Sequence, residues 1–283
     1  MKKIFGLIGH PVKHSLSASM HNAAFREVRL DAEYQLFDKT NEELLGFLAE
    51  VKRPDSSIFG LNVTIPHKQA IHDLLRTSLS DNAKRIGAVN TIIVKEEGQA
   101  RKLIGENTDA QGFLESLDKD LRFDPKDKIV FVLGAGGAAR AIIMALGNAA
   151  DKIYFTDIDE EKAQNLEADY KKYFNPEKIY RIKDRDKTNC VLICDLFVNA
   201  TALGMKEADE LAIEPAALHK NMSIFDVVYN PKETKLLKLA KEKWLNYVNG
   251  LGMLLYQGAL SFRLWTGIEP PIEVMRKALI EAI

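Results

Sequence analysis

The segment Gly134-Ala-Gly-Gly-Ala-Ala139 lies between an apolar, β-branched run at residues 129–133 and a helix-like run at residues 138–146. The order strand, G-x-G-x-x-A, helix is the fingerprint of a dinucleotide-binding βαβ unit. Gly134 permits the tight turn, and Gly136 lets the backbone approach a pyrophosphate, which the N–H groups at the helix start attract. A merely structural tight turn is the alternative. The pattern predicts that a dinucleotide is held by Gly134, Ala135, Gly136, Gly137 and Ala138.

A carboxylate follows the next expected strand, residues 152–156. Asp157 lies 23 residues after Gly134, where the ribose-binding acid of such units is expected. A carboxylate there accepts hydrogen bonds from both ribose hydroxyls of NAD and repels the 2′-phosphate of NADP. Like charges about 4 Å apart repel by about 4 kcal/mol at an effective dielectric constant of about 20. The alternative is that Asp157 or Asp159 only caps the following helix. The residues therefore favour NAD.

The rest of the chain alternates strand-like and helix-like runs, which predicts an α/β fold with parallel sheets and helical crossovers. Strands are expected at residues 3–8, 33–37, 59–65, 129–133, 152–156, 196–199 and 224–228, and a hairpin at residues 90–94 and 101–104. Helices are expected at residues 17–28, 41–51, 108–117, 138–146, 160–173, 233–244, 253–265 and 271–282. The last two helices are expected to return to the first domain.

Composition limits the classes of function. The 283 residues suggest about two domains, and 39 basic against 40 acidic side chains argue against a nucleic-acid partner. The absence of a long apolar run predicts no membrane span, and the first residues show no targeting segment, so a cytoplasmic location is expected. Cys190 and Cys194 are interpreted as reduced thiols, and the histidines, including His10 and His14, show no metal-binding set.

Four polar motifs precede the glycine turn. They are Ser15-Leu-Ser17, Asn62-Val-Thr64-Ile-Pro66-His-Lys68, Gly87-Ala-Val-Asn90-Thr91 and Asn107-Thr108-Asp109. Each has a structural alternative when it is taken singly: Ser17, Thr108 or Asp109 can cap a helix, Pro66 suits a first helical turn, and Lys68 can be a surface charge.

Taken in order, these motifs resemble one family over essentially the whole chain. The series continues with Gly-Ala-Gly-Gly-Ala-Ala-Arg-Ala, Asn199-Ala-Thr-Ala-Leu-Gly-Met205, Asp226-Val-Val-Tyr229-Asn-Pro and Gly252-Met-Leu-Leu-Tyr-Gln257. The chain resembles shikimate dehydrogenases and their quinate/shikimate relatives. The resemblance implies an α/β substrate-binding domain formed by residues 1–110 and 250–283, a Rossmann NAD(P)-binding domain formed by residues 111–249, and a cleft between them.

The resemblance also implies roles for single residues. Lys68 and Asp109 match the catalytic pair of the family. The matching substrate contacts are Ser15, Ser17, Thr64, Asn90, Tyr229 and Gln257. Gly134 to Ala138 match the pyrophosphate site, and positions near the rest of the cofactor are matched by Asn199, Thr201, Val227 and Gly250.

The chain departs from the family pattern at two places. Ala18 replaces a usual proline, with little expected consequence. Asp157-Ile158-Asp159 stands where NADP-using members commonly have Asn-Arg-Thr, so the arginine that would bind the 2′-phosphate is missing. The family implies NADP, whereas these residues favour NAD.

The expected activity is reversible hydride transfer between a nicotinamide cofactor and 3-dehydroshikimate or shikimate, in aromatic amino-acid (chorismate) biosynthesis. A lysine beside a carboxylate can deliver the proton that the reduced ketone oxygen needs. The alternatives are a quinate/shikimate dehydrogenase that uses NAD and, more remotely, a non-catalytic cofactor-sensing paralogue. A small-molecule substrate and a monomer or homodimer are expected, without metal, nucleic acid or membrane.

Overall fold

The computed structural model describes residues 2–98 and 100–283. The chain divides into two compact units. The first unit contains both ends of the chain, Met1–Asp109 and Leu254–Ile283, and the second is the continuous segment Ala110–Met253. The predicted α/β fold with two sheets is confirmed. No helix in the described part of the chain is long and apolar enough to cross a membrane.

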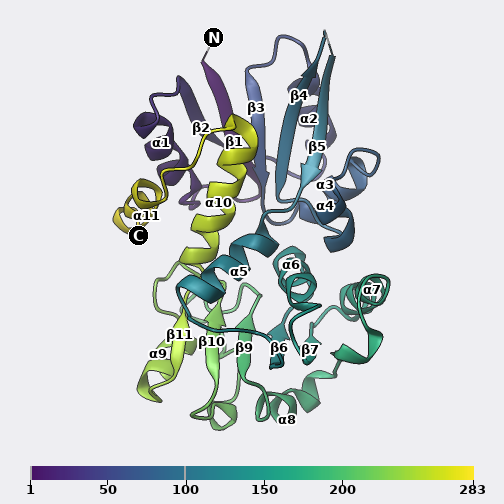
Figure 1. Cartoon of the computed structure of the whole chain (residues 1–283), viewed down its shortest axis with the longest axis vertical. Coiled ribbons are helices and arrows are strands. Elements are labelled where there is room, and N and C mark those ends of the chain that lie inside the picture. Colours follow the sequence, from purple (N-terminus) through teal and green to yellow (C-terminus); the bar gives the residue numbers. More distant parts are fainter. Residues whose placement is uncertain (1, 99) are drawn as a thin grey trace. The chain divides into compact units, whose positions relative to one another are not determined.

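The sheet of the first unit has the order β2-β1-β3-β4-β5 (Figure 1). Its strands are β1 (Lys3–Gly9), β2 (Ala32–Asp38), β3 (Ile58–Val63), β4 (Thr91–Glu97) and β5 (Ala100–Glu106). The first three run parallel, and β4 and β5 form the predicted antiparallel hairpin. These directions bring the carboxyl ends of β1, β3 and β5 and the amino end of β4 to one edge of the sheet.

Helices cover both faces of this sheet. One face packs against α2 (Leu44–Lys52), α3 (Lys68–Leu74) and α4 (Asp81–Ile86) through a buried aliphatic core. The other face meets α1 (Ser17–Glu27) and α10 (Leu251–Thr266), and α11 (Ile272–Glu281) packs beside α1.

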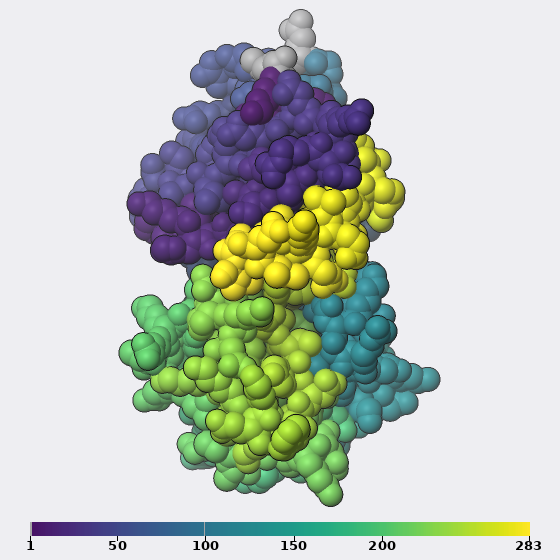
Figure 2. Space-filling view, turned by 90° about the vertical axis from the view of Figure 1, so that its left-hand side faces the viewer, coloured from purple at the N-terminus to yellow at the C-terminus, as the bar shows by residue number. Residues whose placement is uncertain are grey.

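An aromatic cluster joins the two ends of the chain on this second face. Phe5 contacts Phe25 and Trp265, and Phe25 also stacks on Phe262. Figure 2 shows the C-terminal residues lying directly against the N-terminal ones. Residues 254–283 thus belong to the same unit as residues 1–109.

The second unit has a six-stranded parallel sheet in the order β11-β10-β9-β6-β7-β8. Its strands are β6 (Ile129–Leu133), β7 (Lys152–Thr156), β8 (Ile179–Arg181), β9 (Leu196–Asn199), β10 (Ser223–Asp226) and β11 (Asn246–Val248). This is the Rossmann order, in which the direction of winding reverses between β6 and β9. Ligands of such sheets bind outside the carboxyl ends of the strands at that reversal.

The helices of this unit are α5 (Asp109–Lys119), α6 (Gly137–Leu146), α7 (Glu160–Lys171), α8 (Lys187–Val191) and α9 (Lys235–Glu242). Alternate residues of the strands face opposite layers. Ile224 belongs to the core with Leu236 and Leu237 of α9, whereas the next residue, Phe225, meets Phe113 of α5 edge to face. The expected strands and helices are present, with ends shifted by up to three residues, while β8, β11, α4 and α8 were not predicted.

Candidate functional site

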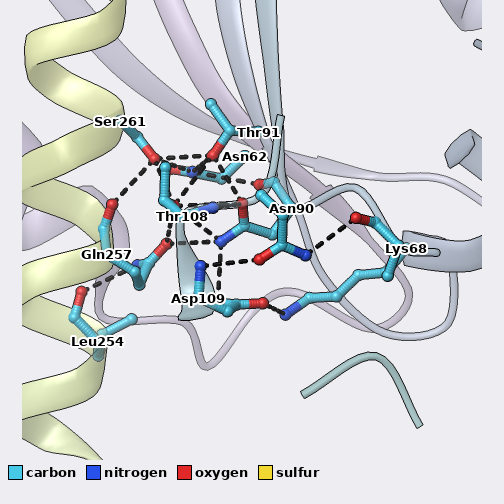
Figure 3. A network of polar contacts seen from close by, with 11 residues as sticks. Asn62, Lys68, Asn90, Thr91, Thr108, Asp109, Leu254, Gln257 and Ser261 are labelled. Atoms are coloured by element: carbon cyan, nitrogen blue, oxygen red, sulfur yellow. Dashed lines mark hydrogen bonds and ion pairs between the residues drawn. The ribbon is translucent and has the colours of Figure 1, made fainter. Parts of the chain in front are cut away.

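Lys68 and Asp109 are paired in the first unit. Lys68 is the first residue of α3, and Asp109 is the first residue of α5. The Lys68 Nζ atom lies 2.6 Å from Asp109 Oδ2, and the two side chains are 15% and 6% exposed (Figure 3). An ammonium group has three N–H donors. Lys68 can therefore bond Asp109 and still donate to a ligand oxygen.

Asn90 fixes the other oxygen of Asp109. Its Nδ2 donates to Asp109 Oδ1 at 2.8 Å. The Asn90 Oδ1 atom accepts from the Thr108 backbone N–H at 2.7 Å and from Thr91 Oγ1 at 2.9 Å. Asn90 is buried at the amino end of β4, so the sheet itself sets the direction of the carboxylate.

Helix α10 brings Gln257 into the same network. Gln257 Oε1 accepts from Asn90 Nδ2 at 3.2 Å (Figure 3). One turn further on, Ser261 Oγ lies 2.8 Å from Thr91 Oγ1 and accepts from Asn62 Nδ2 at 2.9 Å. Sequence reasoning missed Ser261. The available signal was its spacing of four residues from Gln257, which places both side chains on one helix face.

Ser15, Ser17 and Thr64 lie beyond the carboxyl ends of β1 and β3. Ser15 Oγ donates to Ser17 Oγ at 3.2 Å. Ser17 is the first residue of α1 and not its cap, because the cap position is Leu16, which makes no side-chain capping bond. Thr64 is half-buried and follows β3 directly. The expected substrate contacts of this unit therefore share the sheet edge that carries Lys68. Tyr229 belongs to the second unit, where burial raises its pKa.

The glycine turn follows β6, as predicted. Gly134 has a φ of 115°, a conformation that side chains rarely adopt. Gly136 is different, because a Cβ built on it would meet nothing within 4 Å. Packing within the protein does not require glycine there. The open space beside the start of α6 fits a pyrophosphate. Helix α6 begins at Gly137, one residue earlier than expected.

The two aspartates after β7 have different partners. Asp159 is the cap of α7: its side chain accepts from the Lys162 N–H, and its carboxylate pairs with the Lys162 ammonium at 2.9 Å. The hydrogen bond from Lys162 lowers the pKa of Asp159. Asp157 instead accepts from the Ala135 N–H in the glycine turn at 2.6 Å and from the Asp159 N–H at 2.8 Å. Helix capping therefore accounts for Asp159. It does not account for Asp157, whose carboxylate lies beside the glycine turn.

Asn199 is the last residue of β9, and Thr201, Val227 and Gly250 lie beyond the carboxyl ends of β9, β10 and β11. Asn199 Oδ1 accepts from the Thr201 N–H at 3.2 Å and from its hydroxyl at 2.7 Å, so Asn199 fixes the position of Thr201. A Cβ on Gly250 would lie 2.0 Å from the Val227 carbonyl oxygen. Glycine is therefore required at position 250.

Cys190 and Cys194 are free thiols, and burial raises the pKa of Cys194. Among the described residues, no three His, Cys, Asp or Glu side chains gather in a way that could hold a metal ion.

Comparison with known proteins places this site in a family. The profile of the "Shikimate dehydrogenase substrate binding domain" matches residues 7–92, and that of the "Shikimate 5'-dehydrogenase C-terminal domain" matches residues 250–280. A curated shikimate dehydrogenase (NADP(+)) of Methanopyrus kandleri is 42% identical over 98% of this chain and 95% of its own. The chain belongs to the shikimate dehydrogenase family.

Other members of the shikimate dehydrogenase family are similar to this chain over nearly its whole length. The corresponding enzyme of Methanocaldococcus jannaschii, also named for NADP(+), is 41% identical over 99% of this chain and 97% of its own. A solved shikimate dehydrogenase in complex with NADP⁺ has a TM-score of 0.87 at 39% identity and covers 100% of this chain and 96% of its own. The Thermus thermophilus enzyme in complex with NADP(H) and shikimate has a TM-score of 0.85 at 35% identity, over 99% and 100%.

A quinate dehydrogenase of Corynebacterium glutamicum in complex with NAD is also similar, with a TM-score of 0.89 at 30% identity over 99% of both chains. The curated relatives nevertheless carry the shikimate name and support the main interpretation over the quinate alternative. The comparisons do not support the NAD preference expected from Asp157, because these curated relatives are named for NADP(+).

Proposed function

We propose that this protein is a shikimate dehydrogenase that interconverts 3-dehydroshikimate and shikimate with a nicotinamide dinucleotide, in the biosynthesis of aromatic amino acids. The observation that carries the proposal is the partly buried Lys68–Asp109 pair in a chain of this family. The pair also argues against the non-catalytic alternative, because a protein that only senses a cofactor has no need of a proton donor.

The chemistry divides between cofactor and protein. The nicotinamide supplies or takes up the hydride when it is bound. In the direction of ketone reduction, Lys68 Nζ gives a proton to the substrate oxygen, and in the reverse direction it takes that proton back. Asp109 stabilises the ammonium form and holds Nζ in place through the 2.6 Å bond. Asn90 keeps Asp109 from turning toward another partner.

The two units divide the binding tasks. The unit that contains residues 1–109 and 254–283 is proposed to bind the substrate through Ser15, Ser17, Thr64, Asn90 and Gln257. Tyr229 of the second unit stays a prediction from the family resemblance. Hydroxyl and amide groups suit a polyhydroxylated ring carboxylate. A site built on such bonds strongly rejects analogues that lack a hydroxyl. The second unit, residues 110–253, is proposed to bind the dinucleotide at the glycine turn.

We infer further that Asp157 favours NAD over NADP. Its carboxylate is held beside the glycine turn by the Ala135 N–H, so a 2′-phosphate at that place would meet a fixed negative charge. Lys162 pairs with Asp159 instead. The NADP names of the relatives point the other way. The C. glutamicum quinate dehydrogenase, which has the same fold, is solved with NAD.

Initial rates test the activity and the choice of substrate together. Shikimate and quinate are each offered with NAD and with NADP, and the reduced nicotinamide is followed by its absorbance. Shikimate is expected to react much faster than quinate. A protein that oxidises neither acid with either dinucleotide would refute the proposal, and faster turnover of quinate would favour the alternative.

The Asp157→Ser variant tests the cofactor inference. The ratio of kcat/KM for NAD to that for NADP is expected to exceed one in the wild type and to fall by about tenfold or more in the variant, because the repulsion is removed. Asp159→Ser is the matched control, since it removes the charge of the helix cap and leaves Asp157. A tenfold preference of the wild type for NADP would show that the inference is wrong.

The cytoplasmic location and the monomeric or homodimeric state remain predictions.

A further inference from the structure

One buried carboxylate has no part in the proton transfer described above. Asp226 is the last residue of β10, is fully buried, and lies opposite Asn199 of β9 in the sheet register. Removing a carboxylate from water is costly unless hydrogen-bond donors replace the water. The donors that surround Asp226 therefore indicate what it does.

Three donors satisfy both oxygens of Asp226. Oδ1 accepts from Asn199 Nδ2 at 2.9 Å and from the Val228 N–H at 3.1 Å. Oδ2 accepts from Thr234 Oγ1 at 2.6 Å. Burial raises the pKa of Asp226 to about 6, and these three hydrogen bonds act in the opposite direction. The Asp226 carboxylate thus accepts hydrogen bonds from the end of β9 and from two residues that follow β10.

These contacts form a series that continues from Asn199 to the loop after β9. The Asn199 amide that bonds Asp226 also donates to the Leu203 carbonyl at 2.9 Å. The next residue, Gly204, has a φ of 99°, and a Cβ on it would lie 3.2 Å from Thr234 Cβ. Thr234 bonds back to Asp226 and also caps α9. The loops after β9 and β10 are therefore joined by hydrogen bonds through Asp226 at one end, and Gly204 and Thr234 pack closely further along.

These loops carry the proposed cofactor contacts Thr201, which lies beside Gly134 of the glycine turn, and Val227. Because Asn199 uses both ends of its amide within the protein, its own contribution is to hold Thr201. We propose that Asp226 is a positioning residue that holds these two loops in the conformation that binds the dinucleotide. The proposal rests on the proposed function only in requiring that this unit binds a nicotinamide dinucleotide.

The Asp226→Asn variant is the direct test. The asparagine keeps the size of the side chain but presents an NH₂ group where Thr234 or Asn199 now donates. The dissociation constants of NADH and NADPH are measured by their fluorescence on the full chain without shikimate. We expect binding to weaken by about tenfold, the effect of one hydrogen bond to a charged group. The KM for shikimate is expected to change by less than about twofold.

Asp195→Asn is the matched control. Asp195 Oδ2 accepts from the Ile129 N–H at 2.9 Å, at the amino ends of strands in the same sheet. Its replacement also neutralises a carboxylate that accepts from a neighbouring strand, but at the end away from the proposed cofactor site. A merely structural role for Asp226 predicts that both variants lower the melting temperature and leave dinucleotide affinity unchanged.

Thr234 provides a second route if Asp226→Asn does not fold. Thr234→Val keeps the shape and removes the hydroxyl, whereas Thr234→Ser retains it. Weaker dinucleotide binding in Thr234→Val together with near wild-type binding in Thr234→Ser supports the proposal. Affinities within twofold of the wild type in Asp226→Asn, or in both Thr234 variants, overturn it. A wild-type chain that binds neither dinucleotide also overturns it, whereas tight binding without shikimate turnover refutes only the proposed reaction.

Discussion

Lys68 is the residue on which the proposed chemistry depends most directly. In the Lys68→Ala variant the substrate oxygen loses its proton donor, so kcat is expected to fall by about 10²–10⁴, with a much smaller change in KM. Steady-state kinetics with shikimate measure both constants. Lys84→Ala is the control, because Lys84 is an exposed lysine of α4 that pairs with Asp81. Near-normal turnover of Lys68→Ala would remove Lys68 from this role.

His21 makes the stability of the first unit depend on pH. Its ring is fully buried and stacks on Tyr34 with centroids 4.5 Å apart, and the nearby Asn62 side chain only partly opposes the effect of burial. Burial lowers the pKa of His21 from 6.5 to about 3. As the pH falls below about 6.5, His21 binds a proton in the unfolded chain but stays neutral in the folded one. Stability is therefore complete above that pH and is lost progressively toward pH 3.

The expected size of this effect follows from the pKa difference. Each pKa unit corresponds to about 1.4 kcal/mol, so His21 should account for a loss of about 2 kcal/mol in the free energy of unfolding between pH 7 and pH 5. Urea unfolding at the two pH values measures the loss in the wild type and in His21→Phe, where this contribution should vanish. Equal losses in the two proteins would contradict the assignment.

At the scale of elements, the two glycines of the β6–α6 turn have separable tasks. Gly136→Ala points a methyl group into open space at an extended backbone position, so the melting temperature should hardly change while dinucleotide affinity falls by about tenfold or more. Gly134→Ala forces a side chain into a φ of 115° and should cost about 1–3 kcal/mol of stability. Thermal unfolding and dinucleotide titration of both variants separate these effects. A lower melting temperature of Gly136→Ala would show that Gly136 is needed for folding and not for dinucleotide binding.

The elements with strong local patterns were predictable from the sequence, and the rest depend on their neighbours. The bounds of β6, β7 and β9 agree with the expected ranges because buried parallel strands are continuous apolar runs. Strands β8 and β11 have three residues each and lie at the two edges of the sheet, which is too short for a periodic signal. Helix α4 did carry local signals, a Ser80 cap and a left-handed Gly87, which were not used.

The candidate site was predictable as a set of residues but not as a geometry. Motif matches selected Lys68, Asp109, Asn90 and Gln257, which the structure joins by hydrogen bonds. No local pattern states that Asn90 would bond Gln257, because 167 residues separate them in the chain. Ser261 was missed because a serine within an apolar helix gives no sign of the polar partners it meets after folding.

At the scale of the whole molecule, the first unit depends on both ends of the chain. A chain that stops at Met253 lacks Phe262 and Trp265, so Phe5, Phe25 and one sheet face lose their apolar cover. Such a truncated chain should have no shikimate-dependent activity, and its residues 1–109 should be cut rapidly by protease. Limited proteolysis with mass spectrometry tests this, with a chain lacking only residues 282–283 as the control. Protection of residues 1–109 in the truncated chain would contradict the expectation.

The closing of the first unit by residues 254–283 also sets an order for folding during translation. The ribosome releases Met1–Asp109 long before the helices that complete its sheet have been made. At about 5–20 residues per second, the remaining stretch takes on the order of ten seconds or more to synthesise. The continuous segment Ala110–Met253 is synthesised whole in that interval. The sequence of the second unit is therefore complete before that of the first, whose aromatic side chains in β1 and α1 stay without their cover until residues 254–283 have been made.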